Sequence, residues 1–344
     1  MYLKYFSYKA GEWLLKPIPF NKQTLVVGEN ATGKTKMQTS LFRAINVILM
    51  KPMETTMENS FMATFVFSTS SGNELHYVMS VSDNKIVREQ LYYKNDEILA
   101  SRDENHCSFY GEQNISLPEQ MSVLQAKTDL VKYPEAASII EWANSSRKIS
   151  FSKLHPGQGF ETLSIEEMYK TLSIEEIYKI KDILNELGYH VQDIKRLNLE
   201  DKIQFVYLKE IGVEKKIYAT EMSNGLYRVL YILFYMFFVS KRDVRFITID
   251  DLGEGLDYSR STKLGKILFE FCNEQDIQLI ASSNDSFLMD SVELENWLIL
   301  SRKESEIEGV SNASHPKLFD KFRRMGLRNF DIFRTDFIER HKND

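Results

Sequence analysis

The sequence predicts an α/β fold in which a mainly parallel β-sheet is flanked by helices, with an N-terminal antiparallel meander and a helical insertion. Two observations predict the parallel sheet. Short strand-like runs alternate with helical patterns, and these runs are apolar throughout, which is typical of strands buried on both faces. The strand-like runs are Thr24–Val27, Phe246–Ile249 and Ile277–Ala281, and the helical segments are Lys34–Met50, Gly225–Val239 and Tyr258–Asn273.

A third observation predicts the antiparallel meander. The strand-like runs Phe61–Ser68, Leu75–Ser82 and Lys85–Lys94 are separated only by short turn signals at residues 70–72 and 82–84. Connections this short join antiparallel neighbours. Further strands are expected at Met1–Tyr8, Ile203–Leu208 and Lys216–Thr220, because these runs are rich in aromatic and β-branched residues.

The middle of the chain reads as a helical insertion. It contains a near-repeat, Thr162–Lys170 followed by Thr171–Lys179, and each copy carries a Ser-x-x-Glu capping box. The apolar positions shift between the copies, which predicts either two short helices or one helix with a register break. We therefore divide the chain into a first lobe (1–114), the insertion (115–200), a second lobe (201–305) and a Phe/Arg-rich tail (306–344).

The composition limits the classes of function. With 43 basic and 49 acidic residues the net charge is −6, which argues against a chain broadly dedicated to nucleic acid but leaves room for a local basic groove. Cys107 and Cys272 have no metal-binding spacing and are expected to be free thiols. The N-terminus lacks a signal-peptide pattern, and the longest apolar run, Val229–Val239, is too short to span a bilayer. We expect a cytoplasmic protein that makes no membrane contact.

The most specific motif is Gly28-Glu-Asn-Ala-Thr-Gly-Lys34-Thr35, which satisfies the pattern G-x-x-x-x-G-K-[ST]. It follows an apolar strand and opens a helix, so backbone N–H groups can surround phosphates at the helix N-terminus. Lys34 is expected to contact the β- and γ-phosphates of ATP, and the Thr35 hydroxyl to bind Mg²⁺. The predicted nucleotide-binding residues here are Gly28, Glu29, Asn30, Ala31, Thr32, Gly33, Lys34, Thr35 and Lys36.

A second motif is the apolar strand Phe246–Ile249, which ends in Asp250 and Asp251. Together with a phosphate loop, acids at the carboxyl end of such a strand indicate Mg²⁺ chemistry. Asp250 is predicted to hold the metal through water, and Asp251 to orient or deprotonate the attacking water.

A third motif, Met222-Ser223-Asn224-Gly225, precedes that strand and opens an apolar helix, and Leu252–Asp257 follows it. The first resembles the signature of ABC ATPases and the second resembles their D-loop. Ser223, Asn224, Gly225 and Asp257 are therefore predicted to contact nucleotide. The plain alternative for Ser223 is a helix N-cap, and both roles are compatible.

Taken together, the motifs resemble the SMC/RecF branch of ABC-type ATPases, and especially its small stand-alone members in prokaryotic anti-phage systems (PARIS/OLD-like). The resemblance covers about residues 1–100 and 200–300. It implies an ABC ATPase head that binds ATP and Mg²⁺ and closes as a head-to-tail dimer. It also implies a glutamine contact to Mg²⁺, for which Gln90 is the candidate and Gln113 the alternative.

Two positions depart from the family pattern. Asp251 stands where a catalytic glutamate is usual, and Asn284 where a switch histidine is usual; Glu254 is an alternative base. The departures predict slow hydrolysis with ATP binding retained.

The resemblance leaves three functions open. The first is regulation of an effector, a nuclease or toxin, in phage defence. The second is a RecF- or SMC-like DNA clamp, and the third, disfavoured, is a transporter subunit. The tail after His315 is expected mainly to pack on the core, with docking of a partner or nucleic acid as the alternative.

Overall fold

The computed structural model describes residues 1–51, 59–69, 71–104, 106–127, 129, 131–151, 163–199, 203–335 and 337–341. The strands of the main sheet are β1 (Tyr2–Ala10), β2 (Trp13–Pro19), β3 (Gln23–Val27), β4 (Phe61–Ser68), β5 (Glu74–Ser82), β6 (Lys85–Tyr93), β7 (Ile98–Arg102), β8 (Cys107–Phe109), β9 (Glu112–Gln113), β10 (Ser146–Ser150), β14 (Phe246–Asp250), β15 (Gln278–Ser282), β16 (Trp297–Lys303) and β17 (Glu306–Ser311). A small second sheet contains β11 (Val191–Leu199), β12 (Ile203–Glu210) and β13 (Lys216–Tyr218).

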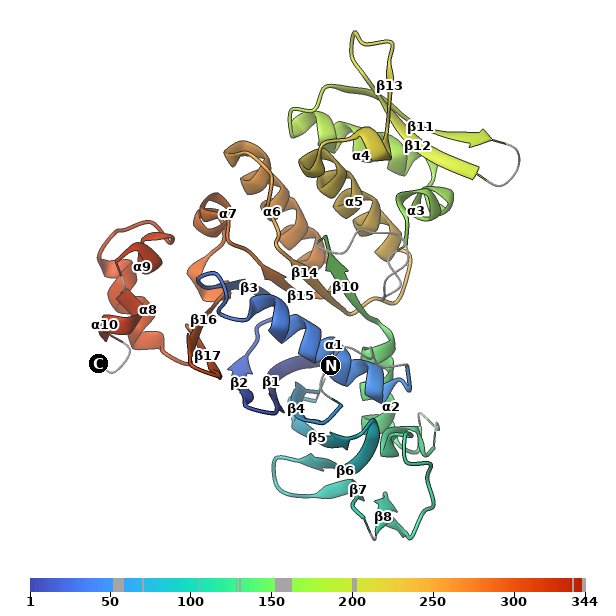
Figure 1. Cartoon of the computed structure of the whole chain (residues 1–344), viewed down its shortest axis with the longest axis vertical. Coiled ribbons are helices and arrows are strands. Elements are labelled where there is room, and N and C mark those ends of the chain that lie inside the picture. The colour runs from blue at the N-terminus through green and yellow to red at the C-terminus, as the bar shows by residue number, and fades with distance from the viewer. Residues whose placement is uncertain are drawn as a thin grey trace.

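The helices lie around these sheets (Figure 1). They are α1 (Lys34–Ile48), α2 (Pro134–Asn144), α3 (Ile165–Thr171), α4 (Ile174–Glu186), α5 (Asn224–Val239), α6 (Tyr258–Glu274), α7 (Ser286–Ser291), α8 (Pro316–Arg324), α9 (Asp331–Arg334) and α10 (Phe337–His341), with short 3₁₀ turns at Val123–Gln125, Ala219–Glu221 and Leu294–Asn296.

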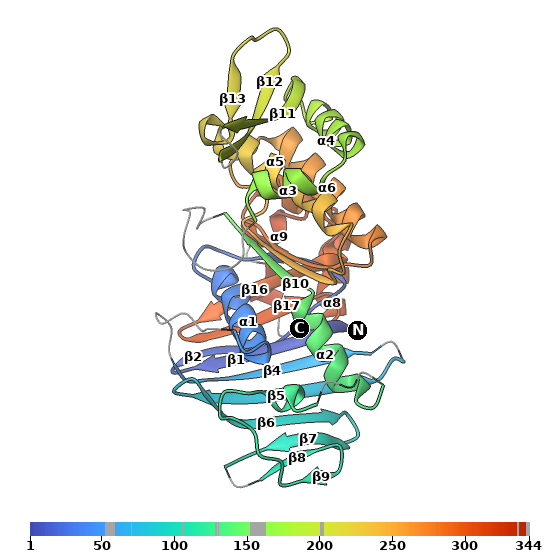
Figure 2. The same ribbon diagram turned by 90° about the vertical axis from the view of Figure 1, so that its right-hand side faces the viewer.

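The main sheet is mixed, with the strand order β10-β14-β15-β3-β16-β17-β2-β1-β4-β5-β6-β7-β8-β9. Strands β10, β14, β15, β3 and β16 run parallel to one another, whereas most other neighbours are antiparallel. The prediction of a mainly parallel sheet was therefore wrong in extent, because the antiparallel meander continues the same sheet. Figure 2 shows this antiparallel part at one end of the molecule and the small sheet at the other.

The parallel block separates two hydrophobic cores. Leu25 and Val27 of β3 contribute to one core, which also contains the buried faces of α5 and α6. Val26, between them, contributes to the other core, together with Met37 and Leu41 of α1. This alternation along β3 follows from the period-two geometry of a strand. It places α1 and α5 on opposite faces of the parallel block.

The apolar run Val229–Val239 lies inside α5 and is almost entirely buried, as predicted. Among the described residues, no helix combines the length and apolar character that crossing a membrane requires. Cys107 and Cys272 are both free thiols, also as predicted.

The segment 115–200 is not helical throughout. It contains β10, which pairs with β14 at the edge of the main sheet, and it ends in β11. The near-repeat forms two short helices, α3 and α4, and each starts with a complete capping box from Ser164 or Ser173. Thr162, where the first copy begins, lies outside the described residues.

The tail packs into the core. Phe319, Phe322 and Phe337 are almost fully buried and belong to the same core as α5 and α6. The rings of Phe322 and Phe337 meet edge to face with centroids 5.2 Å apart. The helices α8–α10 therefore complete the head, which agrees with the core-packing interpretation of the tail.

We expect Phe322→Ala to lower the free energy of unfolding by about 3–5 kcal/mol, because it removes a buried ring and leaves a cavity. Denaturant unfolding measures the change. Met325→Ala is the control on the next residues of the tail, since Met325 is 51% exposed, and an exposed truncation should stay within about 0.5 kcal/mol. Equal effects of the two substitutions would contradict a core role for the tail.

Candidate nucleotide-binding site

The phosphate loop joins the carboxyl end of β3 to the start of α1. Gly33 precedes α1 with φ 101°, a backbone shape that favours glycine, and a Cβ at this position would also push against Cδ1 of Ile307 at 2.4 Å. Lys34 folds under the loop, and its Nζ donates to the carbonyl oxygens of Gly28 (2.6 Å) and Glu29 (3.0 Å). The loop therefore already has the curled shape that directs N–H groups inward.

The charge of Lys34 is poorly screened by water. The residue is 6% exposed, and burial lowers its pKa, while the nearby charges of Asp251 and Asp250 partly oppose that shift. Lys34 makes no ion pair within the described part of the chain. An ammonium in this position is suited to a polyanion such as a triphosphate. Lys36, two residues further along α1, is exposed and its Nζ lies 4.4 Å from the ring centre of Trp13.

Asp250 ends β14 and is 2% exposed. Its Oδ1 accepts a hydrogen bond of 2.6 Å from Ser282 Oγ, and that hydroxyl accepts in turn from the backbone N–H of Asp251 at 3.0 Å. Its other oxygen, Oδ2, is buried and has no hydrogen-bond partner among the described residues. A buried carboxylate oxygen left in this way fits a cation or its water.

The donor set fits Mg²⁺ of the phosphate-loop type. Thr35 is exposed on the first turn of α1, so its hydroxyl is available. In the described ranges, no group of three His, Cys, Asp or Glu side chains is arranged to hold a metal ion. Mg²⁺ does not need one, because it is usually held by one or two carboxylates together with phosphate oxygens and water. Asp250 and Thr35 would supply the protein ligands.

Asp251 occupies a left-handed turn with φ 55°. Aspartate tolerates this region better than longer side chains, because its short polar group bonds locally. Burial raises the pKa of the Asp251 carboxyl, Asp250 and Glu254 raise it further, and the positive charges of Lys34 and Arg228 lower it. The departure from glutamate thus coincides with a backbone shape that suits aspartate.

Asn284 lies in the loop after β15, and its Nδ2 donates to Asn30 Oδ1 at 3.2 Å. This contact brings the predicted switch position to the phosphate loop. Beside it is a cavity of about 290 Å³, which is lined by Gly28, Glu29, Asn30, Asn284, Met289, Phe330 and Phe333. The tail therefore forms one wall next to the phosphate loop, which the sequence did not predict.

Ser223 caps α5, since its Oγ accepts from the N–H of Leu226 at 3.3 Å. Ser223 and Asn224 are exposed, while Gly225 is buried against the D-loop, where a Cβ would lie 2.6 Å from the carbonyl oxygen of Gly255. Asp257 caps α6 and pairs with Arg260 at 2.9 Å. The turn at Gly225 and the loop at Gly255 thus pack directly against each other.

Glu254, the alternative base, is already engaged. Its carboxylate pairs with Nη2 of Arg228 at 2.5 Å. The pair holds the Glu254 side chain against α5. Asp251, which lies at the end of β14 beside Lys34 and Asp250, is the better placed of the two.

The structure does not place Gln90 or Gln113 at this site. Gln90 lies in β6, between Val78 of β5 and Ser101 of β7, and Gln113 lies in β9 at the far edge of the sheet. Seven strand spacings separate β6 from β3 along the sheet, roughly 30 Å at about 4.8 Å per strand. The prediction that one of these glutamines contacts Mg²⁺ is therefore wrong.

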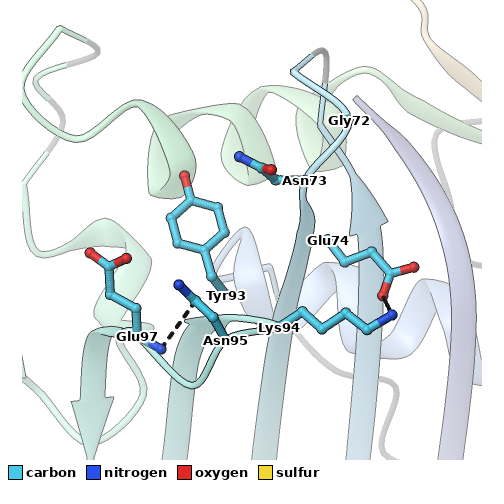
Figure 3. A pocket seen from close by; sticks show the side chains of 7 residues that line it. All are labelled: Gly72, Asn73, Glu74, Tyr93, Lys94, Asn95 and Glu97. Carbon is cyan, nitrogen blue, oxygen red and sulfur yellow. Dashed lines mark hydrogen bonds and ion pairs between the residues drawn. The ribbon is translucent and has the colours of Figure 1, made fainter.

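A separate hollow of about 520 Å³ lies at that antiparallel end, between the β4–β5 and β6–β7 turns (Figure 3). The negative charge of Glu74 on its wall is balanced by ion pairs with Lys4 and Lys94. These pairs hold the pKa of Glu74 down at about 2. The hollow shares no residue with the phosphate loop.

Three residues near the site were missed by sequence reasoning. Ser282 follows an apolar strand just as Asp250 does, so the carboxyl-end rule could have found it. Ser150 ends β10 directly opposite Asp250. Gln38 is fully buried one turn after Thr35, and its Nε2 donates to the Ile249 carbonyl at 3.1 Å, which ties α1 to β14.

Comparison with solved structures identifies the fold. The chain resembles an SMC head bound to the C-winged helix domain of ScpA, with a TM-score of 0.56, 13% identity, and coverage of 90% of this chain and 98% of that one. It also resembles the Smc head domain with an extended coiled coil bound to the C-terminal domain of ScpA from Pyrococcus furiosus, with a TM-score of 0.53, 13% identity, and coverage of 94% and 99%. The chain has the fold of an SMC head domain.

No protein-family model matches the sequence, and no curated protein gives a significant match to it.

Proposed function

We propose that this chain is an ABC-type ATPase that uses Mg²⁺-ATP as a slow switch. One observation carries the proposal. The loop Gly28–Thr35, the pair Asp250–Asp251 and Asn284 all follow carboxyl ends of adjacent parallel strands, on the fold of an SMC head. The carboxyl edge of such a sheet is where nucleotides bind.

Each residue of the site has its own proposed role. The N–H groups of the phosphate loop and Lys34 would bind the phosphates, and Asp250 and Thr35 would hold Mg²⁺, which would supply positive charge beside them. Asp251 orients the attacking water and accepts its proton. Asn284 donates a hydrogen bond to the γ-phosphate but, unlike histidine, carries no positive charge. Turnover is expected to stay below about one per second.

We propose further that ATP is held between two copies. Ser223 and Asn224 are exposed, and α5 lies on the opposite face of the parallel block from α1. Each chain would therefore present its signature to the nucleotide of its partner, and the Asp257 end of the D-loop would lie at the same contact.

We expect Ser223→Arg to bind ATP with near-normal affinity and to stay monomeric, because it places charge and bulk at the contact. Light scattering with a non-hydrolysable ATP analogue measures association, and calorimetry measures binding. Ser240→Arg is the matched control, since it adds the same charge to the exposed far end of the same helix. Association of Ser223→Arg like the wild type would exclude this sandwich.

For the partner, we propose an effector protein, a nuclease or toxin of an anti-phage system, which the closed dimer holds or releases in the cytoplasm. The motif resemblance supports this choice. The alternative is an SMC- or RecF-like DNA clamp, which the fold favours, and the two solved heads are themselves bound to a partner protein. ATP-dependent binding of duplex DNA, with affinity that falls steeply with salt, would select the clamp.

A further inference from the structure

Arg228 of α5 contacts the loop that carries Asp251. It lies on the first turns of α5, and its side chain is 17% exposed. Its Nη1 donates to the carbonyl oxygens of Glu254 (3.1 Å) and Asp251 (3.5 Å), and its Nη2 pairs with the Glu254 carboxylate at 2.5 Å. The guanidinium also lies 5.2 Å from the ring centre of Phe151, the residue that follows β10.

The loop that Arg228 contacts has little regular structure of its own. Asp251, Gly253 and Gly255 all have positive φ, at 55°, 88° and 79°. Backbone N–H groups serve part of this loop, since the carbonyl of Asp251 accepts from Glu254 at 3.3 Å and that of Gly253 from Leu256 at 3.1 Å. Arg228 adds a donor to the carbonyl of Glu254 and pairs with its carboxylate. A planar guanidinium holds its N–H groups in a fixed fork, a geometry that the single ammonium of lysine does not provide.

A second contact joins the same two segments. The backbone of Gly225 lies so close to that of Gly255 that a side chain between them would clash. The signature turn and the loop after β14 are therefore in contact at two points. One is the close backbone approach of Gly225 and Gly255, and the other is the charged hydrogen-bond cluster of Arg228.

We propose that Arg228 is a positioning residue that locks the first turns of α5 to the loop 251–255, so that the signature and Asp251 move as one unit. The consequence rests on the proposed function: because the signature faces the partner's nucleotide and Asp251 faces the chain's own, Arg228 links the two nucleotide sites of a dimer. Truncation should therefore slow hydrolysis without weakening ATP binding.

The first test needs no nucleotide. Amide hydrogen exchange of the free protein is measured for peptides covering 251–257 in the wild type, Arg228→Ala and Arg228→Lys. Losing charge-assisted hydrogen bonds should speed exchange in this loop by about tenfold or more in the alanine variant, and by less in the lysine variant. The control is Arg245→Ala, which removes an arginine paired with Glu141 and Asp243 before the other end of β14.

The second test measures hydrolysis and binding. Arg228→Ala should lower the single-turnover rate by about tenfold, with the ATP affinity from calorimetry within about twofold. Glu254→Gln should have a similar effect, and the double variant no more than either alone, because both substitutions remove one pair. The exchanged pair Arg228→Glu with Glu254→Arg should recover part of the rate, which a merely structural loss of folding would not do.

If amide hydrogen exchange of residues 251–257 is unchanged in Arg228→Ala, Arg228 does not hold this loop against α5. Faster exchange with unchanged hydrolysis would overturn the coupling of the sites. If the wild type bound no ATP, the proposed function and the coupling would both fail, while the exchange experiment would still decide whether Arg228 holds this loop.

Discussion

Lys34→Met is expected to weaken ATP binding by about 100-fold or more. The side chain is almost fully buried under the loop, so methionine keeps the packing of the stem but removes the charge and the two hydrogen bonds to the carbonyls of Gly28 and Glu29. Charge-assisted contacts to two phosphates are worth about 3 kcal/mol together, and 1.4 kcal/mol corresponds to tenfold in affinity.

Calorimetry with Mg²⁺-ATP measures this loss directly. Lys241→Met is the matched control, because Lys241 also donates to a backbone carbonyl, that of Thr171, and pairs with Glu176 far from the phosphate loop. The control should bind ATP like the wild type. Wild-type affinity in Lys34→Met would show that the loop Gly28–Thr35 does not hold phosphates.

The variant should also reveal what Lys34 does in the free protein. Its charge opposes the repulsion between Asp250 and Asp251. Without it, the two carboxylates at the end of β14 remain close together, and Arg228 is left as the other cation that lowers the pKa of Asp251. We therefore expect the pKa of the Asp251 carboxyl to be higher in Lys34→Met than in Lys241→Met, in addition to the loss of ATP binding.

Much of the parallel block could be predicted, because local signals specify it. The strands β3, β14 and β15 are mostly apolar and almost entirely buried, and the loop at Gly28–Thr35 has a fixed spacing. The helices α1 and α6 begin where the sequence predicts, since glycine and Asp257 mark their first turns. These features depend on residues close together in the chain.

The parts that sequence reasoning missed depend on partners far away in the chain. β10 is a short edge strand of mixed polarity, Ser146–Ser150, and only its pairing with β14 makes it a strand. β2 contains two prolines and pairs with both β1 and β17. β-structure of this kind is decided by tertiary contacts more than by local preference.

The same distinction applies to the site. Lys34, Asp250 and Ser223 lie in sequence motifs, so their roles could be proposed from the order and spacing of residues near them in the chain. The bond between Asn284 and Asn30, and that between Arg228 and Glu254, join segments that no motif connects. Gln90 was placed wrongly because a glutamine in a strand carries no signal for the position of that strand in the sheet.

Asp251→Asn is expected to lower the single-turnover hydrolysis rate by about 100-fold or more, while ATP affinity changes by only a few-fold. General-base assistance contributes typically 10² to 10⁴ in rate, and asparagine keeps the shape of the turn at φ 55° but cannot accept the proton. The variant should therefore accumulate in the ATP-bound, associated state, which light scattering with ATP itself would detect.

Asp251→Glu tests whether the length of the side chain or the left-handed turn at this position limits hydrolysis. If the short reach of aspartate limits the wild type, the glutamate variant hydrolyses faster, because its carboxylate extends one methylene further towards the water. If the left-handed turn at Asp251 matters more, the longer side chain is no better placed and the rate does not rise.

Glu254→Gln provides the comparison, and its hydrolysis rate should fall by no more than about tenfold, the loss expected from breaking its pair with Arg228. A loss of 100-fold in Glu254→Gln, together with near-normal hydrolysis in Asp251→Asn, would instead make Glu254 the base, since the carboxylate that accepts the proton must be the one whose loss stops the reaction.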